Sequence, residues 1–409
     1  MEMVHPICCG LDVHQASVVA CLRRSHGRGQ VSLEHETFGA TYQELLRCSD
    51  WLTQAGCPIV AMESSGVYWK PVFHVLSGIV DVVVGNARDI RPRPGRKTDK
   101  RDAAWIAELL AHGLIRPSFV PPPHICALRD VTRTRVGLVQ ARTQTKNRIH
   151  KLLEDTNIKL SSVVADLFGK SARRMLDALV TGERDPKVLA ELAIGRLRPK
   201  VPALELALTG QFTDHHAHLL KLMLDLVDVY DAHIAELDRR IGEIVEPITT
   251  ELELLQTIPG VQKVAARDIL AEIGTDMTRF VSAKRLASWA RVCPGMNESA
   301  GKRHSSRTGK GNRYLRRVLV QCAWATRKTD SFLGQMFRRL QARIGGKKAA
   351  VAVAHRILVI AYHLLRNGVP FNEQLRDRPN PAKVLKHRKR LVKALEQLGY
   401  DVALSPASA

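Results

Sequence analysis

The chain has 409 residues, more than one ordinary hydrophobic core accommodates, so we expect two or three domains. Hydrophobic residues make up 45% of it, which excludes an intrinsically disordered protein. The 62 lysines and arginines outnumber the 40 acidic residues and give a net charge of +22, so the expected partner is a polyanion, with nucleic acid ahead of a membrane surface because no lipidation signal or basic amphipathic helix is evident.

Strand-like and helix-like patterns alternate through the first third of the chain. Short apolar or alternating runs predict strands over residues 7–13, 16–22, 31–37, 59–62 and 80–84. Helical spacing predicts helices over residues 42–55, 67–76 and 99–112. This order predicts a mixed sheet with helices on its faces, an α/β domain over residues 1–123 that the proline-rich segment 117–123 ends.

The middle of the chain, residues 124–250, is expected to be a helical coiled-coil domain. A seam with alternating spacings of three and four predicts a coiled-coil helix, and its members are Leu220, Met223, Val227, Tyr230, Ile234, Leu237, Ile241, Ile244 and Ile248. Pro247 is expected to end or kink it. A second long helix over residues 128–153 has a seam broken by Arg135, Arg142 and Thr145. It either packs against the first helix or presents basic groups to nucleic acid, and pairing between chains is slightly favoured over a plain antiparallel bundle.

Residues 251–371 are expected to form a third, mainly helical domain. Within it, residues 255–266 resemble a helix-hairpin-helix, a motif whose turn and helix N-terminus hold a phosphate. Gln262 stands where the motif usually has its second glycine, so a turn used only for packing is an equal alternative. The tail, residues 372–409, is rich in proline, lysine and arginine and is expected to be a mobile basic arm.

The eight cysteines include no C-x-x-C pair, so a zinc ribbon is not indicated. We expect them to be small buried hydrophobic residues in a reducing cytoplasm. The first residues lack a signal-peptide pattern, and the apolar run near residues 357–365 is too short to span a bilayer. The expected location is therefore cytoplasmic, nucleoid-associated when bound, without a membrane partner.

Four acids occupy positions suited to a metal centre. Asp12 and Glu63 each end a predicted strand, whereas Asp99 and Asp102 share one face of a predicted helix. Clustered carboxylates repel one another unless cations are present, and Mg²⁺ or Mn²⁺ takes such ligands while leaving positions open for phosphate and water. The alternative is that Asp12 is an ordinary turn residue and Asp99 a helix cap. His14, next to the predicted centre, is expected to be a structural histidine.

A basic segment follows much further along the chain. From Lys302 to Arg317 it holds seven lysines and arginines and no acid, and its glycines indicate a loop that suits a phosphate. A serine there would need a base, a metal or a polarised phosphate to become a nucleophile. The chemistry alone leaves three candidates open, Ser299, Ser305 and Ser306, and each of them could be an ordinary loop serine.

The motifs that hold these residues resemble one transposase family. Residues 10–14 read Gly-Leu-Asp-Val-His, residues 62–69 read Met-Glu-Ser-Ser-Gly-Val-Tyr-Trp and residues 97–103 read Lys-Thr-Asp-Lys-Arg-Asp-Ala. Together they resemble the DEDD signature of insertion-sequence family one-hundred-ten. Downstream, Pro294 and Ser299 fit its Pro-x-x-x-x-Ser pattern, and residues 310–316 are similar to its Lys-Gly-Asn-x-x-Leu-Arg run. The resemblance spans roughly residues 7–370 and leaves the tail uncovered.

The resemblance implies a RuvC-like N-terminal domain with an RNase H fold, in which Asp12, Glu63, Asp99 and Asp102 hold Mg²⁺ or Mn²⁺. It also implies that Ser299 is the nucleophile of a recombinase that forms a covalent 5′-phosphoserine link to DNA, guided by a noncoding RNA of its own mobile element. A dimer or tetramer is expected. The basic residues expected to contact nucleic acid are Arg96, Lys97, Lys100, Arg101, Lys302, Arg303, Arg307, Lys310, Arg313, Arg316 and Arg317.

Two other functions are compatible with the same residues. A structure-specific nuclease such as a junction resolvase would use the four acids with water as the nucleophile, and Ser299 would be dispensable. A binding protein derived from a transposase would have no catalytic activity. Metal-dependent cleavage separates the enzymes from the binding protein, and a covalent protein–DNA adduct separates the recombinase from the resolvase.

Overall fold

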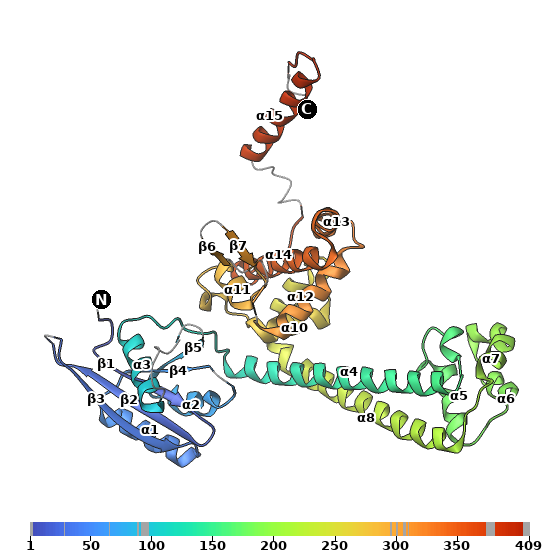
Figure 1. Ribbon diagram of the computed structural model, residues 1–409, viewed down its shortest axis with the longest axis horizontal. Helices are drawn as coiled ribbons and strands as arrows, with labels where there is room; N and C mark the ends of the chain where they lie inside the picture. Colours follow the sequence, from blue (N-terminus) through green and yellow to red (C-terminus); the bar gives the residue numbers. More distant parts are fainter. Residues whose placement is uncertain are drawn as a thin grey trace. The chain divides into compact units, whose positions relative to one another are not determined.

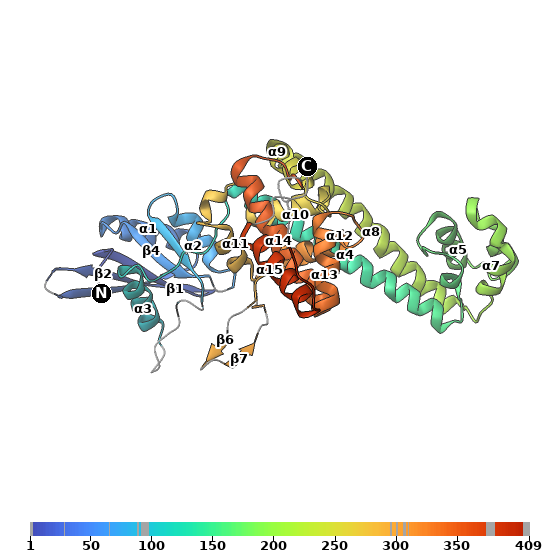
Figure 2. The same ribbon diagram turned by 90° about the horizontal axis from the view of Figure 1, so that it is seen from above.

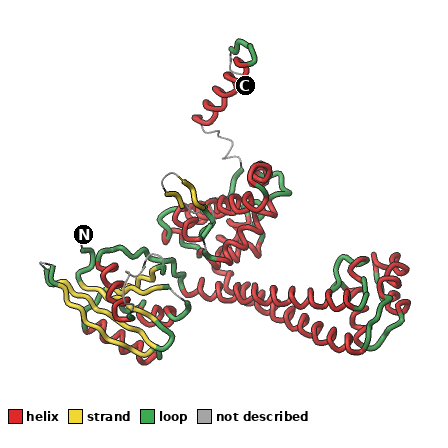
Figure 3. Tube along the Cα trace, viewed as in Figure 1, coloured by secondary structure: helices red, strands yellow, loops and turns green. Residues whose placement is uncertain are grey.

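The computed structural model describes residues 3–27, 29–64, 66–87, 90, 98–294, 297–299, 302–305, 308–309, 311–373 and 381–403, with the backbone alone at 297–299, 302–305, 381–384 and 386–387. The chain forms two compact units, Met1–Val120 and Pro121–Ala409. The larger sheet lies in the first unit, and the second is almost entirely helical (Figure 3). The expected combination of an α/β part and an α part is therefore confirmed.

A five-stranded sheet forms the centre of the first unit, in the order β3-β2-β1-β4-β5. Its strands are β1 (Ile7–Val13), β2 (Ser17–Ser25), β3 (Val31–Gly39), β4 (Ile59–Glu63) and β5 (Asp81–Gly85). The first three strands are antiparallel neighbours, whereas β4 pairs in parallel with β1, and β5 with β4. All five predicted strands are confirmed, and β2 and β3 run past their apolar residues because they pair with each other along their whole length.

Helices cover both faces of this sheet. The helices α1 (Tyr42–Gln54) and α2 (Trp69–Leu76) share a core with one face, and α3 (Asp99–Ala111) packs on the other (Figures 1 and 2). Side chains of β1 alternate between the two: Cys9 and Leu11 face α1 and α2, whereas Cys8 faces α3. The even-numbered residues of β1 therefore face α3.

A pair of long helices opens the second unit. They are α4 (Pro123–Asp155) and α8 (Asp214–Val245), and they lie side by side (Figures 1 and 2). Every seventh residue of the expected α8 seam is buried, namely Leu220, Val227, Ile234 and Ile241. The intervening seam residues are half-buried. The seam is therefore packed within the chain against α4.

Ion pairs explain the polar breaks that the sequence shows in the α4 seam. The Nε and Nη2 atoms of Arg135 donate to the two carboxylate oxygens of Asp238 on α8, at 2.8 and 2.9 Å. Arg142 lies seven residues further along α4, and its Nη1 atom donates to Oδ1 of Asp231 on α8. The α8 helix ends at Val245, two residues before Pro247, as expected. Of the two alternatives for the second helix, packing against the first is thus the one observed.

Three short helices pack with one end of the α4–α8 pair. They are α5 (Lys170–Val180), α6 (Pro186–Glu191) and α7 (Val201–Leu208), and they lie beyond that end (Figure 1). Their core joins Met175 and Leu176 of α5 and Leu204 of α7 to Leu220 of α8. The connection between α4 and α8 is therefore a folded layer that closes this end of the pair.

The remaining helices form a bundle at the other end of the pair. Their bounds are α9 (Thr249–Gln256), α10 (Lys263–Ile273), α11 (Ala283–Ala290), α12 (Arg313–Thr326), α13 (Phe332–Ile344) and α14 (Gly346–Asn367). The expected helix-hairpin-helix is α9 and α10, joined by a turn at Gly260 with φ of 83°. A methyl group on Gly260 would lie 2.6 Å from Thr326 Cγ2 and 2.7 Å from the Cys322 carbonyl oxygen. The packing alternative therefore describes this glycine.

Two C-terminal helices bear on expectations drawn from the sequence. By length and composition α14 could cross a membrane, but half of its most apolar stretch is buried inside the unit. It packs against α12 and α13, which is the situation of a core helix. The tail expected to be a mobile arm contains a helix, α15 (Pro381–Gln397), which was not predicted. Pro381 suits the first turn of a helix, and lysine, leucine and alanine are good helix formers.

The buried positions of α8, spaced seven residues apart, predict that leucines on this helix contribute unequally to stability. We expect Leu220→Ala, fully buried, to lower the free energy of unfolding by about 2–5 kcal/mol, because it leaves a cavity. The matched control Leu226→Ala, 46% exposed, should cost less than about 1 kcal/mol. Urea unfolding followed by circular dichroism measures both. Equal losses would contradict the packing described here.

Candidate metal centre and serine segment

The sheet directs two of the four predicted acids toward α3. Asp12 lies near the end of β1 and Glu63 ends β4, and the parallel register of these strands pairs Leu11 with Met62. Since side chains alternate along a strand, Asp12 is on the same face as Cys8, the face that α3 covers. Glu63 follows Met62, which faces α1 and α2, and is therefore also on the α3 side.

Gly10 allows α3 to lie directly on the backbone of β1. A methyl group at Gly10 would lie 2.1 Å from the carbonyl oxygen of Ala103 and 2.4 Å from the amide nitrogen of Ala107. No side chain larger than hydrogen fits there without moving the helix. Because Asp12 follows two residues later on the same face, this contact brings it to the first turn of α3.

The start of α3 carries the other two acids. Thr98 is the N-cap, and its hydroxyl accepts a hydrogen bond from the amide of Arg101 at 3.3 Å. Asp99 and Asp102 lie in the first turn, where the helix dipole stabilises negative charge. Lys100 and Arg101 are exposed beside them. The cap thus fixes two acids and two cationic residues at one end of the helix.

Asp12, His14 and Asp99 converge on one point, with potential ligand atoms within 4.8 Å of one another. The Nε2 atom of His14 lies 3.1 Å from Asp12 Oδ2 and 3.6 Å from Asp99 Oδ1. Burial raises the pKa of Asp12, His14 lowers it, and the charges of Asp102 and Asp99 raise it further. Asp102 therefore belongs electrostatically to the same cluster.

This donor set fits a divalent cation. Carboxylates from β1 and α3 meet an imidazole. The negative charges on α3 oppose the ionisation of Asp12, and a bound cation would relieve this repulsion. The side chains of His14 and Asp99 are 47% and 59% exposed, so the point is open to solvent. Carboxylates suit Mg²⁺ and Mn²⁺, and an imidazole ligand is better suited to Mn²⁺.

The structure brings some predicted residues together and adds one. Asp12 and Asp99 are within ligand distance of a common point, while Glu63 and Asp102 fall outside that group of three in the described part of the chain. His14 was expected to be structural, yet it is the third member. Its position two residues after Asp12, directly after the end of β1, was the signal in the sequence.

The predicted serine loop contains a short hairpin. Its strands are β6 (Asn297–Ser299) and β7 (Lys302–Ser305), and Ser299 pairs with Lys302. The glycine-rich sequence was expected to be a loop only. For Ser299, Lys302 and Arg303 the backbone alone is described, and Arg96, Lys97, Arg307 and Lys310 lie outside the described residues.

Three further basic residues begin α12. Arg313 is exposed, and its guanidinium lies 4.8 Å from the centre of the Tyr314 ring. Arg316 and Arg317 are half-buried. Arg317 lines a small cavity beside Glu272, so protein groups surround part of its side chain.

Comparisons with known proteins agree with the motifs at both ends of the chain. The DEDD transposase model of IS110 matches residues 9–158, and the model described as transposase IS116/IS110/IS902 family matches residues 252–335. The chain is 31% identical over 152 residues to the pilin gene-inverting proteins of Moraxella bovis and Moraxella lacunata. That match covers 35% of this chain and 47% of either relative, so the chain spans about half the length of these relatives.

A longer match joins both regions. The chain is 28% identical over 303 residues to the insertion element IS900 uncharacterized 42 kDa protein of Mycobacterium paratuberculosis. The match covers 68% of this chain and 73% of that protein. The similarity therefore extends over more of the chain than either region that the family models match.

The close approach at Gly10 predicts how the centre can be disrupted. We expect Gly10→Ala to push α3 away from β1 and weaken Mn²⁺ binding at least about tenfold, because ligands from the two elements separate. Gly78→Ala is the matched control in the same unit, since an added methyl group there meets nothing within 4 Å. Titration of Mn²⁺ by electron paramagnetic resonance measures the affinity. Unchanged binding in Gly10→Ala would show that the centre does not depend on this contact.

Proposed function

The chain belongs to the IS110 family of transposases, and we propose that it cuts and rejoins DNA through a covalent 5′-phosphoserine intermediate assisted by a divalent metal. The observation that carries this proposal is the convergence of Asp12, His14 and Asp99. Three such groups at an open position beside Lys100 and Arg101 support a site that binds a cation next to an anionic substrate. Phosphodiester chemistry is what such a site supports.

The residues that would hold the metal are Asp12, Glu63, Asp99 and Asp102, with His14 beside them. A bound Mg²⁺ or Mn²⁺ would polarise the scissile phosphate or stabilise the leaving oxygen. Asp12 is held by the sheet, and Asp99 and Asp102 are held by the capped turn of α3. These rigid supports keep the acids clustered despite their mutual repulsion.

The first unit is proposed to be a RuvC-like domain with an RNase H fold. Supporting this are the strand order β3-β2-β1-β4-β5, the antiparallel first three strands and the parallel last two. The acids lie on β1, on the neighbouring β4 and on α3. Residues 124–250 and 251–371 are proposed as the coiled-coil and transposase domains that follow it.

Ser299 is proposed as the nucleophile. Its Oγ forms a bond to phosphorus while the bond from phosphorus to the 3′ oxygen breaks. The serine proton leaves, and the departing 3′ oxygen takes up a proton, so a 3′-hydroxyl and a 5′-phosphoserine result. The reverse attack by a 3′-hydroxyl of another strand restores both the phosphodiester and the serine. Because the link conserves the phosphodiester bond energy, joining needs no ATP.

The proposed partners are DNA and a noncoding guide RNA, with the protein acting as a dimer or tetramer. The charge of +22 supports a polyanionic partner. Lys100, Arg101 and Arg313 are exposed cationic residues near the acids or after the serine. Base pairing by a guide would supply sequence specificity while the protein holds the backbones.

The covalent intermediate tests the proposal. The protein is incubated with Mg²⁺, the DNA that joins the ends of its own element, and the transcript of that element's noncoding end. A denaturing gel then detects the protein–DNA adduct. We expect Ser299→Ala to abolish the adduct, whereas the controls Ser305→Ala and Ser306→Ala retain it, because only Ser299 supplies the oxygen that attacks phosphorus.

The metal requirement is tested in the same assay. Asp12→Asn or removal of Mg²⁺ with a chelator should reduce adduct formation by about 100-fold or more, because charge on the phosphate is no longer stabilised. Cleavage that persists in Ser299→Ala without an adduct would replace the proposal with a water-using nuclease. Binding without any cleavage would leave only the binding protein.

A further inference from the structure

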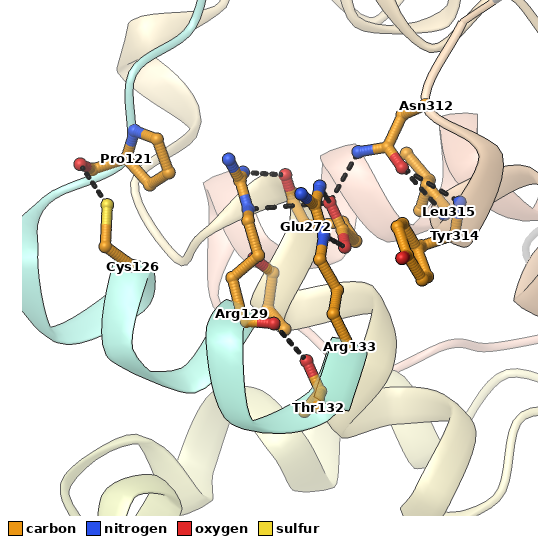
Figure 4. Close-up of polar contacts among 10 residues, drawn as sticks. Pro121, Cys126, Arg129, Thr132, Arg133, Glu272, Asn312, Tyr314 and Leu315 are labelled. Atoms are coloured by element: carbon orange, nitrogen blue, oxygen red, sulfur yellow. Dashed lines mark hydrogen bonds and ion pairs between the residues drawn. The ribbon is translucent and has the colours of Figure 1, made fainter. Parts of the chain in front are cut away.

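Glu272 is a buried acid near the end of α10, with 2% of its side chain exposed. A buried carboxylate is costly unless its oxygens are paired. The Nε and Nη2 atoms of Arg133 donate to its two oxygens at 2.8 Å each (Figure 4). Arg129 lies 3.5 Å from Oε2 and also donates to the carbonyl oxygens of Ala271 and Glu272. Two arginines of α4 therefore fix this carboxylate.

The third partner of Glu272 is Asn312, which precedes α12. The Nδ2 atom of Asn312 donates to Oε2 of Glu272, and its Oδ1 accepts from the amides of Tyr314 and Leu315 at 3.1 Å each (Figure 4). A carboxylate can only accept, so it orients the amide group of Asn312 with the oxygen toward the helix. One side chain thus caps α12 and ties it to α10.

Gly311 closes the base of the segment that carries Ser299. A methyl group at Gly311 would lie 2.6 Å from the carbonyl oxygen of Ala290 and 2.5 Å from Cβ of Arg291. Residues 291–311, here called the serine segment, therefore begin and end in direct contact. The β6–β7 hairpin lies between these two ends.

We propose that Glu272 and Asn312 position the serine segment for strand cleavage. Because its two ends touch, fixing Asn312 fixes the base from which the hairpin extends. Arg133 strengthens the link, since its guanidinium also lies 4.7 Å from the centre of the Tyr314 ring. The role of both residues is to hold the nucleophile's backbone, without touching DNA. This inference rests on Ser299 being the nucleophile proposed above.

An exchange of donor and acceptor tests the contact. Asn312→Asp keeps an oxygen that caps α12 but replaces the donor with an oxygen facing the Glu272 carboxylate. We expect adduct formation to slow by about tenfold or more, with DNA affinity within about twofold of wild type. In the double variant Glu272→Gln with Asn312→Asp, the amide and the carboxylate change places, so the hydrogen bond is restored. The rate of adduct formation by the double variant should therefore lie within about threefold of the rate of the Glu272→Gln single variant.

A matched control separates this contact from a general effect of charge or capping. Ser282→Asp adds a negative charge at the N-cap of α11 in the same bundle and should leave the rate unchanged. Hydrogen exchange of residues 297–305 supplies a readout that needs no activity. Exchange there should speed up in Asn312→Asp and slow again in the double variant when each is compared with its parent, wild type or Glu272→Gln.

The experiment distinguishes failure of this positioning role from failure of Ser299 as the nucleophile. A wild-type rate in Asn312→Asp, or a loss that the double variant does not recover, overturns the positioning role. If the wild-type protein forms no adduct yet the exchange pattern reverses as expected, the proposed nucleophile fails and the structural tie stands. If adducts form but exchange and rate do not follow the hydrogen bond, the tie fails and the nucleophile stands.

Discussion

The contact between β1 and α3 at Gly10 determines whether the candidate metal centre can exist. Strand β1 and helix α3 are separated by about ninety residues of sequence, and their acids meet only because the helix backbone rests on the strand backbone. At the usual spacing of a helix above a sheet, side chains would keep them further apart. Clustered acids repel one another, so the energy that holds them comes from the packing of α3, through Ile106, against Cys8 and Ala61 of the sheet.

The second unit also holds charged groups close together, but there the groups carry opposite charges. In the first unit, like charges are held together by apolar packing and remain open to a cation. Around Glu272, a buried carboxylate is already paired with two partly exposed arginines and an amide, so the group is suited to holding a position rather than binding a ligand. The difference in exposure, 59% for Asp99 against 2% for Glu272, separates a binding role from a positioning role.

The local patterns that the sequence shows are enough to predict the elements of the first unit, because short apolar runs mark the central strands and helical spacing marks the three helices. The acids at strand ends follow from the same patterns. His14 and Glu272 were missed for a different reason. His14 stands beside Asp12 in the sequence, but its contact with Asp99 depends on the fold, as does the contact of Glu272 with Asn312. The helix α15 in the tail was not predicted because the charge of this segment was weighed above the helix-forming tendency of its residues.

The seam of α8 illustrates what a seven-residue period in a sequence can and cannot predict. Such a period reports that a helix packs along one stripe, and it does not distinguish a partner in the same chain from one in another. Here α4 occupies the stripe, and its Arg135 is a seam residue only because Asp238 lies opposite. Leu222, Leu226 and Val229 are exposed on α8 outside that row. An association between chains would therefore have to use a face other than the one that the period identified.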